Sequence, residues 1–296
     1  MKVIHQCIIR IILYFKKIRI MSDTGCLYIV PTPIGNLQDI TLRALTVLKS
    51  VDAIACEDTR HSRVLLQHFS IDKPTFAVHD HNESMMVNKV IQRLEKGESI
   101  ALISDAGTPL ISDPGYVLVH ACREINANVV ALPGPCAAVT ALSGSGLPTD
   151  QFIFRGFLPV KQQAKQQAIE TLLHSYCTSV FYEAPRRVLD TMKMMEQCLP
   201  DTITIVMAKE ITKTFETFIS GSASTIIAWL EAEQAHQKGE FVLMVGPAEK
   251  DTSDISPEAQ TLMRSLQSHL PPKKAAGIVA EHYGLKKNAI YQWSLT

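Results

Sequence analysis

The stretch LYIVPTPIGN at residues 27–36 decides the fold. Its first four residues form a short apolar run typical of a buried strand, and a turn rich in proline and glycine follows directly. The prolines stiffen this turn, and Gly35 permits a close approach of the backbone. A helix opened by Asp39 and Thr41 comes next. A strand, a turn and a helix in this order predict a crossover unit of an α/β protein.

The same alternation continues along the first half of the chain. Amphipathic stretches at 42–48 and 87–94 lie between β-rich runs, which predicts a mainly parallel sheet whose strands are buried on both faces. The predicted strands are 27–30, 53–55, 75–78, 100–103 and 128–132.

A second series of elements begins after the sequence GSGLPT at residues 144–149. Some of its strands follow one another without a helix, so we expect a mixed sheet. The predicted strands are 151–154, 178–182, 203–208, 214–219 and 240–245, and the predicted helices are 163–174, 186–197 and 222–231.

The two ends of the chain differ from its middle. Residues 1–20 hold five lysines and arginines and no acid, and Met21 would serve as a native start. We therefore expect an over-extended N-terminus rather than a membrane-surface helix.

At the other end, a polar linker follows residue 247, and residues 273–293 have the pattern of a helix, a turn and a helix. The expected domains are an extension at 1–20, α/β domains at 21–147 and 148–248, and a linker with a basic helical tail at 249–296.

Composition and motifs exclude several classes of protein. The 296 residues are 46% hydrophobic with a formal net charge of zero, so any nucleic-acid contact has to come from a local basic patch. The seven scattered cysteines form no Cys-x-x-Cys pair and are interpreted as reduced core residues. No dinucleotide fingerprint or phosphate-binding GK(S/T) motif is present. A zinc deaminase pattern fails at Val139, where a cysteine is required, so no metal site is predicted.

Three glycine- and proline-containing loops follow predicted strands of the first domain, at residues 31–36, 104–115 and 131–136. Open α/β sheets bind their ligands at the carboxyl ends of strands. The second loop carries Asp105 and Asp113, and the third presents the free amides of a helix start. Each loop alone could be a simple turn, but three in one sheet predict a ligand site.

These loops and three further motifs carry a family resemblance. The motifs are ACEDTR at 55–60, HDHNE at 79–83 and FYEAPR at 181–186. Together they resemble the tetrapyrrole methylase superfamily from about Cys26 to Lys250, and the ending KKNAIY at 286–291 resembles the C-terminal extension of its ribosomal RNA branch. The first loop lacks the glycine-rich form of the porphyrin-precursor enzymes, which favours the RNA branch. Cys136 stands where a serine is expected.

The resemblance implies two α/β domains with a cofactor cleft between them and S-adenosylmethionine as the cofactor. It further implies 2′-O-methylation of a cytidine ribose in the decoding region of 16S rRNA, in the small ribosomal subunit, by a cytoplasmic homodimer with no membrane association. Carried over by position, the cofactor-binding residues are Pro33, Gly35, Asp105, Ala106, Gly107, Asp113, Pro133, Gly134, Pro135, Tyr182, Ala208 and Gly239.

Methyl transfer from a sulfonium to an oxygen is an in-line displacement, so alignment supplies most of the acceleration and a positioned proton acceptor adds to it. The candidate catalytic proton acceptors are Glu57, Asp58, Glu183 and Glu210, and His79 and Asp80 are further candidates. Glu57 and Asp58 could instead cap the helix that begins at Thr59. The candidate RNA-binding cations are Arg60, Lys209, Lys213, Lys286 and Lys287, and simple solvation is the alternative for them.

Two rival functions remain at this point. The same fold could methylate a tetrapyrrole precursor or a protein side chain, although the basic helical tail argues against this. Alternatively, the helix-turn-helix could be primary, in a non-catalytic nucleic-acid-binding regulator whose α/β part senses a metabolite.

Overall fold

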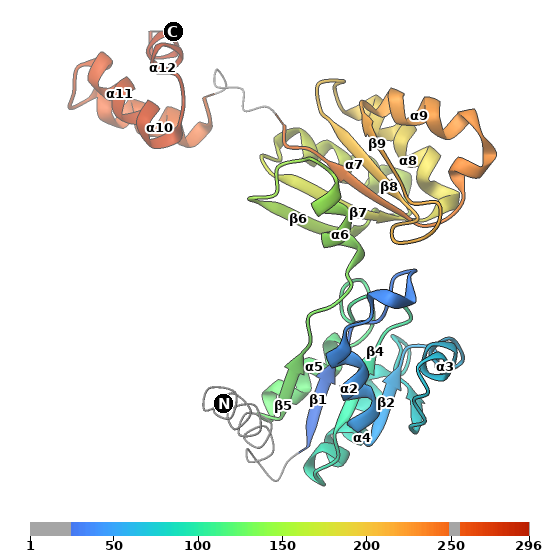
Figure 1. Cartoon of the computed structure of the whole chain (residues 1–296). Helices are drawn as coiled ribbons and strands as arrows, with labels where there is room; N and C mark the ends of the chain where they lie inside the picture. Colours follow the sequence, from blue (N-terminus) through green and yellow to red (C-terminus); the bar gives the residue numbers. More distant parts are fainter. Residues whose placement is uncertain (1–24, 249–254, 296) are drawn as a thin grey trace, which may run out of the picture. The chain divides into compact units, whose positions relative to one another are not determined.

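The computed structural model describes residues 25–248 and 255–295 (Figure 1). The expected extension at 1–20 and the choice between Met1 and Met21 lie outside the described residues. One compact unit contains two α/β sheets, and a second contains the C-terminal helices. The domain boundaries at residues 147 and 248 stay predictions.

The first sheet has five parallel strands in the order β3-β2-β4-β1-β5 (Figure 1). Each is short and begins within one residue of its predicted start. The strands are β1 (Cys26–Ile29), β2 (Ala53–Cys56), β3 (Thr75–Ala77), β4 (Ile100–Ile103) and β5 (Asn128–Ala131). The order places β4, β1 and β5 side by side, and the carboxyl ends of parallel strands meet at one edge of the sheet.

Alternation along the strands explains why this sheet is covered on both faces. Ile54 and Cys56 of β2 pack with α2 (Leu42–Ser50) and α3 (Thr59–His68). Ala55, between them, points to the other face and packs with α4 (Glu83–Glu95) and α5 (Tyr116–Glu124). The predicted burial on both faces is confirmed for β2 and β4, all of whose residues are buried. The short 3₁₀ helix η1 (Leu37–Asp39) precedes α2.

The second sheet has the order β6-β7-β10-β8-β9. Its strands β6 and β7 are parallel and the other pairs are antiparallel, so the predicted mixed sheet is confirmed. The strands are β6 (Phe152–Phe157), β7 (Thr178–Glu183), β8 (Ile205–Lys209), β9 (Thr217–Gly221) and β10 (Phe241–Val245).

Helices cover both faces of this second sheet. Helix α6 (Ala137–Gly144) packs on one face, where Val206 and Ala208 of β8 contribute to the same apolar cluster. The other helices are α7 (Gln162–Glu170), α8 (Pro185–Cys198) and α9 (Ala223–Ala232), with the 3₁₀ helices η2 (Thr171–His174) and η3 (Gln234–Gln237). Helix α9 contacts β9, α8 and η3.

The C-terminal unit contains α10 (Pro257–Gln267), α11 (Pro272–Tyr283) and α12 (Lys287–Trp293), with an apolar core of its own. Gly284 ends α11 in the left-handed conformation, with φ of 64°, and α12 begins three residues later. The predicted helix, turn and helix are confirmed. Within the described part of the chain, no helix is long and apolar enough to cross a membrane.

Candidate methyl-donor site

The three loops predicted to meet are held together by hydrogen bonds. Thr32 of the first loop exchanges two backbone hydrogen bonds with Gly107 of the second, at 2.8 and 3.0 Å. The Thr108 hydroxyl donates to the carbonyl of Pro135 in the third loop at 2.8 Å. The prediction that these loops share one edge of the sheet is therefore confirmed.

Two glycines allow this close packing. Gly107 has φ of +83°, a conformation that strongly favours glycine. A Cβ at Gly134 would lie 2.6 Å from Cβ of Pro31, closer than two carbon atoms can approach. The loops after β1 and β5 can lie side by side only because residue 134 lacks a side chain.

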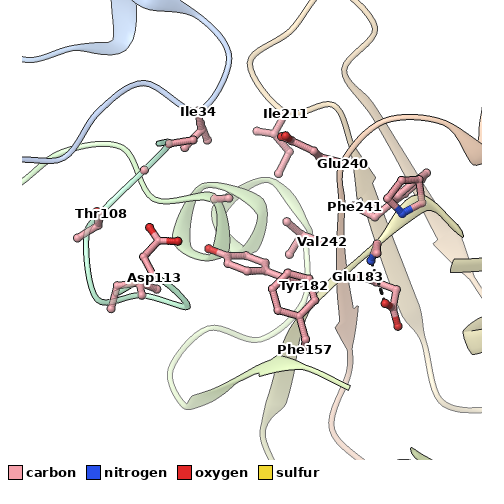
Figure 2. A pocket seen from close by; sticks show the side chains of 16 residues that line it. Ile34, Thr108, Asp113, Phe157, Tyr182, Glu183, Ile211, Glu240, Phe241 and Val242 are labelled. Carbon is pink, nitrogen blue, oxygen red and sulfur yellow. Dashed lines mark hydrogen bonds between the residues drawn. The ribbon is translucent and has the colours of Figure 1, made fainter. Parts of the chain in front are cut away.

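A cavity of about 340 Å³ opens beside these loops (Figure 2). Its volume is in the range of small-molecule sites, and its walls are mainly apolar. The first sheet contributes loop residues, and the second contributes residues of β6, β7 and β10 and of the segment after β8. The lining residues are Ile34, Ala106, Gly107, Thr108, Ile111, Asp113, Ala137, Phe157, Tyr182, Glu183, Ala184, Pro185, Ile211, Glu240, Phe241 and Val242.

Tyr182 joins β7 to the start of α6 at this cavity. Its hydroxyl accepts a hydrogen bond from the backbone N–H of Ala138 at 3.1 Å, in the first turn of α6. The N-cap residue of that helix, Cys136, makes no side-chain cap, so Tyr182 supplies the acceptor that a serine was expected to supply. The rings of Phe154 and Phe157 pack edge-on against Tyr182 and fix its position.

Asp113 is one of three acids that line the main cavity, with Glu183 and Glu240, and the Tyr182 hydroxyl is directed toward its side of the cavity (Figure 2). Burial raises the pKa of Asp113 to about 6, and the negative charges of Glu57, Asp105 and Asp80 add to this, while a hydrogen bond with Ser104 opposes it. No lysine or arginine within 25–248 and 255–295 forms an ion pair with Asp113, so a bound cation would stabilise its ionised form.

A smaller cavity of about 240 Å³ shares Ile34, Ala106 and Glu240 with the main one. Its lining includes Pro33, Gly35, Asp105, His61 and Lys213. The loop after β2 is fixed here by reciprocal hydrogen bonds. The Asp58 N–H donates to Asp105 Oδ1 at 3.2 Å, and the Asp105 N–H donates to Glu57 Oε2 at 3.4 Å.

Two of the four predicted proton acceptors, Asp58 and Glu210, are paired with cations and have a lowered pKa. Asp58 caps α3 and forms a 2.7 Å ion pair with Arg60, and the hydrogen bonds of Arg60 hold the pKa of this exposed carboxyl well below its usual range. Partial burial acts to raise the pKa of Glu210, but hydrogen bonds from Lys213 Nζ and from the N–H of Glu240 outweigh it, and the pKa is lowered. Both groups are therefore weak bases.

Glu183 is buried in a polar network. The Thr191 hydroxyl donates to its Oε2 at 2.7 Å, and the Ala184 N–H donates to its Oε1 at 2.9 Å. The Arg187 guanidinium lies 3.1 Å from Oε1, close enough for an ion pair. Lys165, itself buried, donates to the Thr191 hydroxyl at 3.1 Å. These contacts tie Glu183 to the start of α8, where Ala184 and Pro185 line the cavity.

Glu57 differs from the other three predicted acceptors. Burial is the main cause that raises its pKa, and no ion pair joins it to a lysine or arginine within 25–248 and 255–295. A carboxylate with a raised pKa is a stronger base, so Glu57 is the group among the four whose surroundings suit proton transfer.

The predicted cofactor-binding residues divide among several places. Ala106, Gly107, Asp113 and Tyr182 line the main cavity, whereas Pro33, Gly35 and Asp105 line the smaller one. Pro133, Gly134 and Pro135 belong to the loop that braces the others, and Ala208 packs in the apolar cluster under α6. Gly239 lines a third cavity.

The apolar walls of the main cavity were not predicted. Ile34, Ile111 and Phe157 come from three separate segments, and each reads in the sequence as an ordinary core or turn residue. Phe157 alone carries a usable indication, because it is a large aromatic residue placed directly before a proline-containing turn.

The predicted RNA-binding cations also differ in their surroundings. Arg60 is exposed and paired with Asp58, and Lys213 bridges Glu210 and Glu240 at 2.9 Å each. Lys286 and Lys287 are exposed at the start of α12. Lys209 is buried and lines the third cavity.

Comparison with known proteins defines the class of this chain. The family model for tetrapyrrole (corrin/porphyrin) methylases matches residues 26–227, and that for the RsmI C-terminal HTH domain matches residues 253–296. The chain belongs to the tetrapyrrole methylase family, and it is a methyltransferase.

Within this family, the chain is similar to proteins named ribosomal RNA small subunit methyltransferase I. It is 52% identical to the protein from Haemophilus influenzae over 93% of this chain and 98% of that protein. It is 50% identical to the protein from Pasteurella multocida over 92% of this chain and 97% of that protein.

Solved structures share the fold at low sequence identity. A uroporphyrin-III C-methyltransferase from Thermus thermophilus covers 76% of this chain and 95% of its own, with a TM-score of 0.52 and 20% identity. The methyltransferase CobJ matches 76% of this chain and 95% of its own, with a TM-score of 0.56 and 14% identity. Another structure of the Thermus enzyme is a complex with S-adenosylhomocysteine (TM-score 0.54, 14% identity, 76% of this chain and 98% of that one).

Proposed function

We propose that this chain transfers the methyl group of S-adenosylmethionine to RNA of the small ribosomal subunit, at the 2′-oxygen of a cytidine ribose in the decoding region of 16S rRNA. The observation that carries the proposal is the identity of about half, over more than nine-tenths of the chain, to proteins named ribosomal RNA small subunit methyltransferase I. The C-terminal helices, which match the domain found in such proteins, add a candidate RNA-binding element.

The main cavity fits the methyl donor. Its apolar walls suit an adenine ring, its volume suits a molecule of this size, and the carboxyl of Asp113 suits a positive charge. When bound, S-adenosylmethionine supplies an activated methyl group on a cationic sulfur. Gly107 offers a backbone without a side chain at the cavity wall, and Tyr182 holds the start of α6 in place.

The chain's own residues then orient the acceptor and receive its proton. The smaller cavity adjoins the main one through Ile34, Ala106 and Glu240, so an acceptor ribose there would lie next to the donor. Glu57, tied to the Asp105 N–H at this edge of the sheet, is the proposed proton acceptor. Its raised pKa favours removal of a proton from a weakly acidic hydroxyl.

The proposal includes a homodimer in the cytoplasm. Strand β6 lies at an edge of the second sheet and exposes Phe152, Ile153 and Phe157, a set of large apolar residues that a second copy would cover. Cys26, Cys56 and Cys122 are buried and form no disulfide, as a reducing compartment requires. Sedimentation equilibrium at micromolar concentration measures the dimer directly.

Transfer of a labelled methyl group from S-adenosylmethionine tests the function. The full chain is incubated with purified 30S subunits, with free 16S rRNA or with a tetrapyrrole precursor, and the labelled nucleotide is mapped. We expect label at one cytidine 2′-oxygen of the rRNA. Label on the tetrapyrrole, or no label on any acceptor from a chain that binds the donor, would refute the proposal.

An Asp113→Asn variant is expected to change the pH dependence of both stability and donor binding. The folded state raises the pKa of Asp113 from 3.8 to about 6, so wild-type stability falls as the pH rises through this interval. The variant should therefore match the wild type below pH 3.8 and gain stability relative to it above pH 6. Urea titrations at several pH values measure this difference.

The same group controls binding of a cation. Wild-type affinity for S-adenosylmethionine should rise as the pH increases through about 6, because ionised Asp113 attracts the positive charge, and this rise should be absent in Asp113→Asn. Equal pH profiles for the two proteins would show that Asp113 does not face the charge of the donor.

A Lys286→Ala/Lys287→Ala variant is expected to weaken RNA binding without changing donor affinity. Both lysines are exposed at the start of α12, in a unit with its own apolar core. Loss of two phosphate contacts should reduce the slope of log affinity against log salt concentration by about two. An unchanged slope in filter-binding titrations would exclude these lysines from the RNA interface.

A further inference from the structure

A third cavity, of about 460 Å³, lies at the end of β8 and shares no lining residue with the main or the smaller cavity. Its lining includes Lys209, Phe215, Trp229, His236 and Lys238. Side chains alternate along a strand, and Ala208 packs with α6. Lys209 therefore points to the opposite face of the sheet, toward α9 and η3, and away from the donor cavity.

Lys209 is only 9% exposed, and its ammonium forms no hydrogen bond or ion pair with any residue that the structure describes. The nearest acid in sequence, Glu210, is already occupied by Lys213 and by the N–H of Glu240. The charge of Glu210 still acts on the Lys209 ammonium through space. An ammonium that lines a cavity and has no hydrogen-bonded acceptor is suited to an anionic group of a ligand.

The walls of this cavity are aromatic. The rings of Trp229 and His236 are stacked at 3.8 Å with an angle of 4°, and His236 Nδ1 lies 2.7 Å from the carbonyl of Trp229, so the pair forms a fixed flat surface. Phe215 is 73% exposed, on the loop between β8 and β9. Exposed aromatic rings beside lysines are the elements with which proteins bind single-stranded nucleic acid.

We propose that this third cavity binds one unpaired nucleotide of the RNA substrate, with the base stacked on Phe215 and the phosphate at Lys209 and Lys238. The inference rests on the proposed function for the identity of the ligand as RNA. Two acids line the cavity: Glu210, which is paired with Lys213, and Glu233, whose side chain is 70% exposed near His236. Because Lys213 neutralises Glu210 and water solvates Glu233, the two lysines favour a phosphate.

The test separates stacking from simple apolar packing at position 215. Binding of a fluorescein-labelled single-stranded RNA of about 12 nucleotides, within the usual site sizes, is measured by anisotropy with the full chain. Phe215→Leu, which keeps apolar volume but removes the ring, should weaken binding about tenfold. Phe215→Tyr keeps the ring and should bind like the wild type.

Lys209→Met tests the phosphate contact. We expect weaker binding and a salt slope reduced by about one, with an unchanged Tm, because the Lys209 ammonium makes no hydrogen bond or ion pair within the described residues that the substitution would remove. Lys49→Ala, an exposed lysine on α2, serves as the control and should leave the slope unchanged. Donor affinity should be the same in all variants. If Lys209→Met does not fold, the Phe215 pair decides, since that side chain is exposed.

Each outcome has one meaning. A wild type that methylates 30S subunits while Phe215→Leu and Lys209→Met bind RNA equally well would overturn this inference and leave the proposed function intact. A wild type that neither binds nor methylates RNA would overturn both. Loss of binding in Phe215→Leu with retention in Phe215→Tyr supports a stacked base.

Discussion

A Glu183→Ala variant is expected to lose about 3–5 kcal/mol of unfolding free energy, the usual cost of breaking a buried ion pair. The Glu183 side chain is fully buried and accepts hydrogen bonds from Thr191 and from the Ala184 N–H. Its removal leaves Arg187 without its countercharge. Arg187 also donates to the carbonyls of Leu158 and Pro159, so the segment after β6 should loosen as well.

Urea unfolding of the full chain measures this loss, with Glu196→Ala, an exposed position on the same helix α8, as the matched control. A change below 1 kcal/mol would contradict the positioning role. Glu183→Gln separates positioning from catalysis. A variant of normal stability and normal KM that has lost its kcat would identify Glu183 as a proton acceptor instead.

A Gly134→Ala variant is expected to bind S-adenosylmethionine about tenfold more weakly than the wild type. The added Cβ would lie 2.6 Å from Cβ of Pro31, so the loops after β1 and β5 would have to move apart. Strain of this kind typically costs about 1–3 kcal/mol. The movement also disturbs the hydrogen bond between Thr108 and Pro135, which holds the third loop against the second.

Gly277→Ala provides the control for this substitution. Its Cβ would meet Lys287 at 3.6 Å, an ordinary van der Waals distance, and residue 277 lies in the C-terminal unit. Calorimetric titration should show donor affinity unchanged in this control. Wild-type affinity in a folded Gly134→Ala protein would mean that the packing of the three loops is not needed for the site.

Most of the fold could be predicted because the spacing of apolar residues and the positions of glycine- and proline-containing turns agree along the chain. The strand expected at 100–103 matches β4, and the buried runs around it alternate with helices as expected. The prediction was less accurate for the strand at 151–154, which the structure extends to Phe157. A register shift between Phe154 and Phe157, with Gly156 at φ of 65°, continues this strand past the point where a pattern of period two stops.

Helix ends were harder to predict for a related reason. The helix expected at 163–174 is α-helical only to Glu170 and continues as the 3₁₀ helix η2. The last turn of a helix often tightens in this way, and apolar spacing does not distinguish the two forms.

The placement of the loops at the candidate site could be predicted, but the electrostatic state of its acids could not. Asp58 and Arg60 are close in sequence, so their pairing was accessible, whereas Glu183 depends on Thr191 and Arg187 across the start of a helix. The raised pKa of Asp113 results from its burial and from acids on other loops. Such effects come from tertiary packing, which residue spacing does not encode.

A crystal structure of the full chain with S-adenosylhomocysteine tests the central claim most directly. We expect one molecule per chain in the cavity beside Gly107 and Tyr182, with the sulfur on the side of Asp113. Density for the ligand elsewhere on the molecule, or an empty cavity at saturating concentration, would contradict it.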